Sequence, residues 1–236
     1  MKLFLKRITK YNNLIISLLL LLILTTFLVI NSTQNRVVHA SPSLGITIVI
    51  DAGHGGIDPG CIGRLTKITE AELNLKIAKK LESLLLSSGF EVVLTRKNEN
   101  GLYGIYDKNY KERDMAERKR IIEEAHPELA ISIHMNSFTS TKSRGAQVFF
   151  EEKNEKSKVL AEILQELLKN NIEASTHDAS LGDYYILHAT NYPTVLCECG
   201  YLSNPEDEKL LTDEKHQDKL AYNLYAGIVS YINSSH

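Results

Sequence analysis

Three polar side chains in this sequence each stand at the end of an apolar run that we expect to be buried. They are His54 after residues 46–51, His134 at the end of residues 129–134, and Glu198 at the end of residues 194–198. A buried polar group needs a partner to offset the loss of its hydration. One shared metal ion would supply that partner, and two imidazoles with one carboxylate and an open fourth position suit a catalytic zinc site.

Both histidines also have an ordinary structural interpretation. His54 is equally at home as a turn residue in a glycine-rich loop, and His134 as a core histidine with satisfied hydrogen bonds. Gly53 and Gly55 leave room for a metal or a substrate chain to approach the backbone. The joint placement of the polar residues at strand ends favours the metal interpretation more than either histidine alone.

The elements that must position these residues alternate between strands and helices. Apolar and β-branched runs predict strands at residues 46–51, 91–95, 129–134, 146–150, 184–187 and 194–198. Helical spacing predicts helices at residues 70–88, 110–125, 157–172, 205–211 and 216–231. This alternation is typical of a single α/β domain, with a mostly parallel twisted sheet of about six strands and helices on both faces. Sites in such sheets collect beyond the carboxyl ends of the strands, where the three polar residues fall.

The first 43 residues differ from the rest of the chain. Basic residues precede an uncharged run from Leu14 to Ile30, which is at the lower limit for a membrane span and slightly longer than a usual signal-peptide core. Val38-His39-Ala40 has the small-residue pattern of a cleavage site. We therefore expect residues 1–43 to be a signal peptide or a retained membrane anchor with a linker. Residues 44–236 would then form one domain outside the cytoplasmic membrane, because the positive end stays inside.

Charge and cysteine content exclude some classes of function. The net charge is −2 and no basic block follows the first ten residues, so nothing indicates a nucleic-acid partner. The three cysteines are Cys61, Cys197 and Cys199, and an odd number leaves at least one thiol free. Period-two alternation directs Cys197 and Cys199 away from the Glu198 face of their strand. We interpret all three cysteines as small buried apolar residues.

Three segments resemble the N-acetylmuramoyl-L-alanine amidases of the Amidase_3 type. They are Ile48–Gly56, Ser132–Ser137 and Glu198–Asn204, and they occur in the family's order across nearly the whole domain. The resemblance implies an α/β fold with one bound Zn²⁺. It matches His54 and His134 to the two histidine ligands and Glu198 to the catalytic glutamate. That glutamate takes a proton from water and delivers one to the leaving L-alanine nitrogen.

The third metal ligand in this family is a glutamate at the start of the first helix, ahead of a helix leucine. Leu75 fits that leucine and selects Glu70. Glu72 competes, and would otherwise be a first-turn carboxylate favoured by the helix dipole. The sequence also departs from the family pattern, because Ala52 stands where proline is usual and Met135 replaces a small residue. Met135 lies beside a ligand, where it bears on substrate fit or metal affinity.

Five other polar residues keep open assignments. Arg96 and Arg118 either form structural ion pairs, the interpretation we place first, or contact carboxylates of the stem peptide or muramic acid. Asn136 either orients a ligand or holds a turn. We expect His177 and His188 in surface positions or loops.

The resemblance implies hydrolysis of the amide bond between the muramic lactyl group and L-alanine in peptidoglycan. The compact layout is similar to the germination-specific, spore-cortex amidases, which remove stem peptides so that muramic-δ-lactam can form in the forespore intermembrane space. Residues 150–184 are too few for the gating helix of division-associated amidases, and we find no wall-binding repeat. Recruitment would then depend on the N-terminal segment, in contact with the membrane, or on a protein partner. The alternatives are another zinc hydrolase of the same polymer, a peptidase or deacetylase, and a non-catalytic wall-binding domain.

Overall fold

The computed structural model describes residues 18–23, 25–26, 43–104 and 108–235, and the chain divides into two units, Met1–His39 and Ala40–His236. In the first unit, residues 18–23 and 25–26 are helical. The remainder of the expected signal or anchor run, and the expected cleavage site, lie outside the described residues. None of the described helices is both long enough and apolar enough to cross a membrane.

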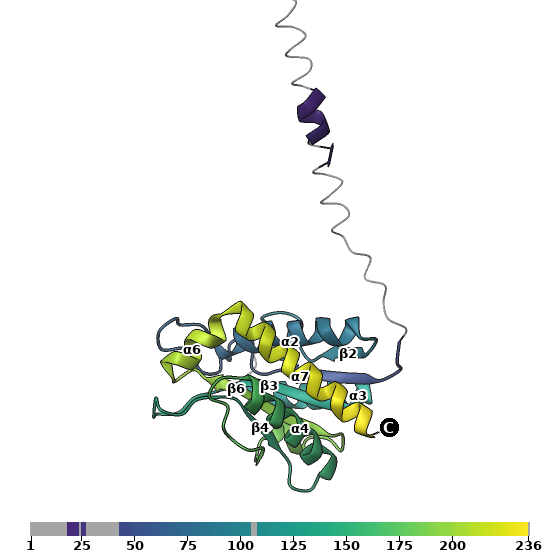
Figure 1. Cartoon of the computed structure of the whole chain (residues 1–236). Helices are drawn as coiled ribbons and strands as arrows, with labels where there is room; N and C mark the ends of the chain where they lie inside the picture. Colours follow the sequence, from purple (N-terminus) through teal and green to yellow (C-terminus); the bar gives the residue numbers. More distant parts are fainter. Residues whose placement is uncertain (1–17, 24, 27–42, 105–107, 236) are drawn as a thin grey trace, which may run out of the picture. The chain divides into compact units, whose positions relative to one another are not determined.

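The second unit is built on one six-stranded sheet (Figure 1), which confirms the predicted α/β class. The spatial order is β2-β1-β3-β6-β4-β5. Neighbouring strands are parallel except for β4, which runs antiparallel to β6. The strands are β1 Thr47–Ala52, β2 Glu91–Leu94, β3 Leu129–Asn136, β4 Gln147–Phe150, β5 Ser180–Leu181 and β6 Thr194–Tyr201.

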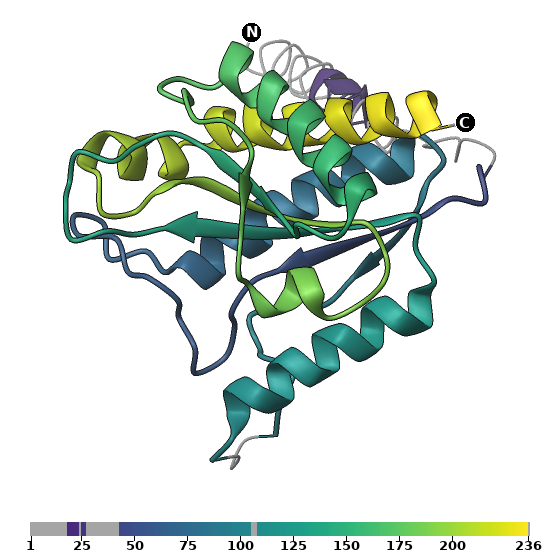
Figure 2. The ribbon, with the colours of Figure 1, turned by 90° about the horizontal axis from the view of Figure 1, so that it is seen from below.

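Helices cover both faces of this sheet, as predicted (Figure 2). The helices are α2 Glu70–Ser87, α3 Tyr110–Ala125, α4 Glu155–Asn171, α5 Tyr185–His188, α6 Pro205–Thr212 and α7 Glu214–Ser235. α2, α4 and α7 pack together over one face, and α3 and α5 lie on the other. Along β1, Ile48 and Ile50 join the core on the first side while Val49 joins a smaller cluster on the second. β1 is therefore buried on both faces, as expected for a central parallel strand.

One predicted strand is wrong. Residues 184–187 do not join the sheet; instead α5 forms there, and the two-residue β5 occupies the sheet edge. Adjacent residues of a strand point to opposite faces, whereas Ile186 and Leu187 are both buried in the same cluster. A short helix buries both side chains in that cluster, so packing overrides the strand propensity of this segment.

The strands that carry the predicted site are longer than their apolar runs. β3 continues to Asn136 and β6 to Tyr201, so His134 and Glu198 lie inside the strands rather than at their last residues. The register pairs His134 directly with Glu198, and an irregularity follows between His134 and Asn136. Both side chains therefore start from the same face and level of the sheet.

Candidate active site

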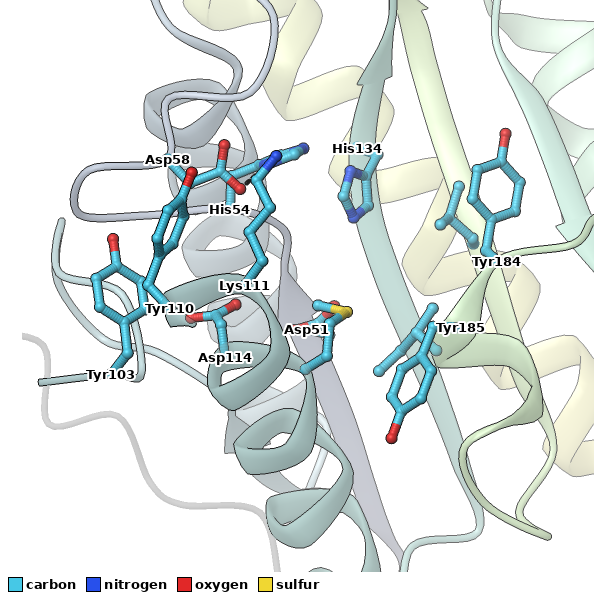
Figure 3. A pocket seen from close by; sticks show the side chains of 13 residues that line it. Asp51, His54, Asp58, Tyr103, Tyr110, Lys111, Asp114, His134, Tyr184 and Tyr185 are labelled. Carbon is cyan, nitrogen blue, oxygen red and sulfur yellow. Dashed lines mark hydrogen bonds and ion pairs between the residues drawn. The ribbon is translucent and has the colours of Figure 1, made fainter. Parts of the chain in front are cut away.

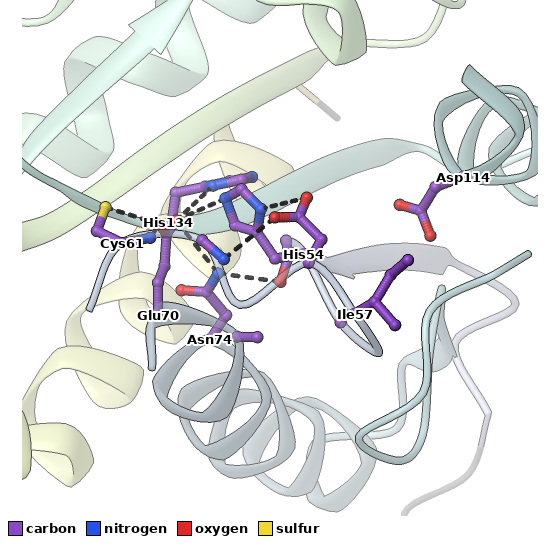
Figure 4. A network of polar contacts seen from close by, with 12 residues as sticks. His54, Ile57, Cys61, Glu70, Asn74, Asp114 and His134 are labelled. Carbon is purple, nitrogen blue, oxygen red and sulfur yellow. Dashed lines mark hydrogen bonds and ion pairs between the residues drawn. The ribbon is translucent and has the colours of Figure 1, made fainter. Parts of the chain in front are cut away.

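His54, Glu70 and His134 converge near the carboxyl ends of β1 and β3 (Figure 4). The Oε1 atom of Glu70 lies 3.1 Å from Nε2 of His54 and 2.8 Å from Nδ1 of His134. One ligand-capable atom from each residue lies within 4.8 Å of the other two. Within the described part of the chain, no other group of three His, Cys, Asp or Glu side chains meets that condition. The three residues form a candidate metal site.

The geometry of this cluster fits a catalytic zinc ion. Ligand bonds of about 2.0–2.1 Å in a tetrahedral arrangement place ligand atoms about 3.3 Å apart, only slightly farther than the separations of Glu70 Oε1 from the two histidine nitrogens. Two imidazole nitrogens and one carboxylate oxygen are also a donor set that catalytic zinc uses.

The start of α2 explains why Glu70, and not Glu72, joins the histidines. The Thr69 hydroxyl caps the helix by accepting a hydrogen bond from the backbone N–H of Glu72, which makes Glu70 the first helical residue. Glu70 is buried and turns back toward the β1–α2 loop. Glu72 is exposed and forms an ion pair with Lys76 at 2.6 Å. The structure therefore places Glu70, which the resemblance selects, beside the two histidines, and the competing Glu72 lies outside the cluster.

The charges of His54 and Glu70 favour a cation in this cluster. Burial lowers the pKa of His54, but hydrogen bonds and charge from Glu70 and Asp58 outweigh it and raise the pKa to about 9. Burial also opposes ionisation of Glu70, but the two imidazoles hold the pKa of its carboxyl well below the usual range. In the absence of metal, a proton on His54 balances the carboxylate. A metal ion would displace that proton, so binding should release it.

Asp58 and Cys61 support the candidate ligands, and neither role was predicted from the sequence. Asp58 Oδ2 lies 2.9 Å from His54 Nδ1, which leaves Nε2 facing Glu70. The backbone N–H and the thiol of Cys61 donate to Glu70 Oε2 at 2.8 and 2.9 Å. Carboxylate and N–H partners of this kind fix the orientation of metal ligands. The only sequence signal for Asp58 was its place four residues after His54 in the same loop.

The interpretation of Cys61 as a buried apolar residue is wrong. Its side chain is half-buried and makes polar contacts, because the chain between β1 and α2 brings it beside Glu70. Burial and the neighbouring Glu70 carboxylate raise the pKa of the Cys61 thiol, which keeps it protonated as a donor. Cys197 and Cys199 are buried in the larger core cluster, as predicted.

Two buried arginines hold the backbone that carries His54, a residue in the left-handed region with φ 60°. Arg118 donates to the His54 carbonyl at 2.7 Å and forms ion pairs with Asp51 and, at 2.6 Å, with Asp114. Arg96 donates to the carbonyls of Ala52, Gly53 and Ala71 at 2.6–2.9 Å. The predicted structural ion pairing is confirmed for Arg118. It is wrong for Arg96, which is also structural but binds backbone carbonyl oxygens instead of carboxylates.

The remaining polar candidates lie apart from the metal cluster. The Asn136 side chain accepts a hydrogen bond from the Ser137 N–H at 2.8 Å, which favours its role in holding the turn. His188 lies 3.2 Å from both Glu151 and Asp183. His177 contacts the Arg144 carbonyl at 3.3 Å. The expectation of surface or loop positions is confirmed, because His188 is exposed at the end of α5 and His177 lies in a loop.

Glu198 is a buried carboxylate with an unused hydrogen-bonding atom. It is 6% exposed, and its Oε2 has no hydrogen-bond partner among the described residues. Burial and the nearby Glu70 charge raise the pKa of Glu198 to about 7, although both histidines oppose the shift. A carboxyl group that titrates near neutrality can both accept and donate a proton at physiological pH.

Comparisons with known proteins decide the family. Residues 48–230 match the model of the Amidase_3 family, described as N-acetylmuramoyl-L-alanine amidase. The chain belongs to this amidase family. It is 35% identical over 194 residues to the germination-specific N-acetylmuramoyl-L-alanine amidase of Bacillus subtilis, covering 80% of this chain and 81% of that relative.

Two further similar proteins are also named as amidases. The probable cell wall amidase LytH of Staphylococcus saprophyticus is 31% identical over 205 residues, which are 86% of this chain and 64% of that protein. The structure of the CwlD amidase from Clostridioides difficile, in complex with the GerS lipoprotein, has a TM-score of 0.77 and 38% identity. It covers 80% of this chain and 99% of that chain. The predicted enzyme class and fold are confirmed.

A first prediction for this amidase concerns Gly53, over which the His134 ring packs. A Cβ atom added at Gly53 would lie 2.2 Å from Cε1 of His134, so the ring must move. We expect Gly53→Ala to weaken metal binding at least tenfold while the fold persists, because ligand orientation is lost. Metal titration with circular dichroism measures both. Gly104→Ala is the matched control, since a Cβ there meets nothing within 4 Å. Wild-type metal affinity in Gly53→Ala would contradict the packing argument.

A second prediction follows from the raised pKa of Glu198. The unfolded chain loses this proton near pH 4.5 and the folded chain near pH 7, so unfolding is increasingly favoured between these values. Above pH 7 the penalty is constant, at most about 3 kcal/mol. We therefore expect metal-free Glu198→Gln to be more stable than the wild type at pH 8 and equally stable at pH 4. Denaturant titrations at both pH values test this, with the exposed Glu72→Gln as the control. Equal stabilities at pH 8 would show that the buried Glu198 charge does not destabilise the folded protein.

Proposed function

We propose that this amidase is zinc-dependent, with His54, Glu70 and His134 as the metal ligands and Glu198 as the residue that moves the proton. The observation that carries the proposal is the cluster of three donor side chains beside a buried carboxylate with an unpartnered oxygen. The substrate bond is the amide between N-acetylmuramic acid and L-alanine in peptidoglycan, as the family implies.

Each residue has a distinct task in this proposal. Zinc, when bound, supplies Lewis acidity that polarises the scissile carbonyl and acidifies a water molecule. The Glu198 carboxylate accepts the proton of the attacking water and then donates it to the departing L-alanine nitrogen. Arg118 keeps the His54 backbone in place, and Asp58 keeps its ring turned toward Glu70.

Product analysis tests the bond that is cut. Purified, zinc-loaded protein is incubated with peptidoglycan, and the digest is examined for new amino termini and released sugars. New L-alanine amino termini with intact glycan chains are expected. Released acetate would indicate a deacetylase, and new termini inside the stem peptide would indicate a peptidase. No products from an active-site-intact, metal-loaded protein would favour a non-catalytic wall-binding domain.

We further propose that the substrate is spore-cortex peptidoglycan, where stem-peptide removal precedes muramic-δ-lactam formation. Similarity to a relative named as a germination-specific amidase supports this role. Spores from a strain lacking the gene are expected to contain no muramic-δ-lactam. Normal lactam content would place the enzyme on another wall polymer.

Residues 1–43 are proposed as the export signal or membrane anchor, on the strength of their basic start and uncharged run. Amino-terminal sequencing of the mature protein distinguishes cleavage from retention.

An additional protein partner is proposed for recruitment, because a related amidase was solved in complex with a lipoprotein. Affinity purification from sporulating cells, with Glu198→Gln to preserve the wall, tests for the partner.

A further inference from the structure

A pocket lies beside the metal cluster, between α3 and α5, on the face of the sheet opposite α2, α4 and α7 (Figure 3). His54 and His134 form part of its wall, so the pocket opens directly onto the reacting centre. Its volume is about 240 Å³. It can take a residue-sized group adjoining the scissile bond.

The pocket adjoins the Glu198 side of the cluster. Leu196 lines it, and Leu196 and Glu198 point to the same face of β6 because they are two residues apart. Tyr184, the N-cap residue of α5, forms the neighbouring wall, and burial together with the Glu198 charge raises the pKa of its hydroxyl. A group that occupies this pocket therefore extends from the bond whose leaving nitrogen Glu198 would protonate.

Lys111 is the one lysine or arginine among the described residues that line the pocket. Its side chain is exposed on α3, and Figure 3 shows it beside Asp58 and His54, across the pocket from Tyr184 and Tyr185. Its charge contributes to lowering the pKa of Asp58, which confirms that the two groups are neighbours.

The acids of the pocket form their close ion pairs with residues other than Lys111. Asp51 and Asp114 pair with Arg118, and Asp58 binds His54. In the described part of the chain, no hydrogen bond or ion pair engages the Lys111 ammonium, so an incoming anion does not have to displace a partner. The sequence also indicated Arg96 and Arg118 as cations that could contact the substrate. Both are buried and donate to backbone carbonyls around His54 instead.

The charges of the substrate decide which part of it fits. The lactyl carboxyl group of muramic acid is consumed in the scissile amide, so the glycan on that side is neutral. The stem peptide carries the anionic groups, and the residue after L-alanine bears a carboxyl group that is either free or amidated. The exposed ammonium matches a free carboxylate, and the apolar and tyrosine side chains of the pocket match the methylene chain that carries it.

We propose that this pocket binds the stem-peptide residue that follows L-alanine, and that Lys111 recognises its free carboxylate. The inference rests on the proposed amidase function and deepens it, by making Lys111 a specificity-determining residue for unamidated peptides. Lys111 does not act on the reacting bond, so its removal should change substrate binding more than turnover.

Two muramoyl peptides that differ only in this carboxyl group, free or amidated, test the proposal. The wild type is expected to cleave the free acid with a KM about five- to tenfold lower and a similar kcat. Lys111→Gln should lose this preference by weakening only the free acid, and Lys111→Arg should keep it. Lys119→Gln, on the same helix but outside the pocket, is the matched control.

Binding of the free-acid and amidated product peptides to Glu198→Gln, with and without Lys111→Gln, gives a readout independent of turnover. Equal affinity of both peptides, or a preference that survives Lys111→Gln, would overturn the inference while the amidase assignment stands. If the wild type cleaves neither substrate at the muramoyl amide, the proposed function fails as well. The two failures are therefore distinguishable.

Discussion

Glu198→Gln is expected to lower kcat for muramoyl-peptide hydrolysis at least about 10³-fold while the metal content stays at the wild-type level. General acid–base catalysis contributes about 10²–10⁴-fold, and here one carboxyl group would serve both the attack and the departure steps. Glutamine has nearly the same shape but neither accepts nor releases the proton. The measurement is steady-state hydrolysis by metal-loaded protein, with metal quantified in the same sample.

Retained metal is essential to this prediction. Glu198 is not in the cluster of His54, Glu70 and His134, so its loss should remove proton transfer and leave the binding site intact. The exposed Glu72→Gln is the matched charge control and should keep full activity. If Glu198→Gln retained more than a tenth of the wild-type kcat, another residue would have to move the proton.

Glu70→Gln is expected to bind metal at least about 100-fold more weakly than the wild type, and Glu72→Gln to bind it equally well. Loss of a residue that merely orients a ligand costs about 10–100-fold in metal affinity, so loss of a charged ligand should cost no less. Glu70 is buried between two imidazoles, whereas Glu72 pairs with Lys76 on the surface. Competition titration with a zinc-binding dye gives the affinities.

Proton release provides a second check on the same change. The raised pKa of His54 depends on the Glu70 carboxylate, so wild-type protein at pH 7.5 should release a proton from His54 when it takes up metal. Glu70→Gln removes that carboxylate and should release fewer protons per metal bound. Unchanged affinity in Glu70→Gln, together with weakened binding in Glu72→Gln, would reverse the ligand assignment.

The sheet and the positions of the main site residues could be predicted because they depend on local patterns. Buried runs ending at Asp51, His134 and Glu198 marked parallel strands, and the carboxyl ends of parallel strands meet at one edge. The helix that carries Glu70 was predicted from its apolar spacing. The family resemblance then separated the ligand role of Glu70 from the catalytic role of Glu198.

The remaining features depend on contacts between distant segments. The sequence of α5 has strand propensity, and only its packing against the second cluster makes it a helix. The polar role of Cys61 also depends on a distant contact, because the thiol donates to Glu70 only once the loop brings the two residues together. Lys111 is one of many helix lysines in the sequence, and its significance appears only when α3 and α5 enclose a pocket.

The central claim is that His54, Glu70 and His134 hold the catalytic zinc ion. Anomalous diffraction from zinc-soaked crystals, recorded above and below the zinc absorption edge, tests it most directly. We expect one strong peak about 2.0–2.2 Å from a nitrogen of each histidine and an oxygen of Glu70, with Glu198 near but unbound. A peak coordinated by Glu72 or Cys61 instead, or no peak between the two histidines, would contradict the account.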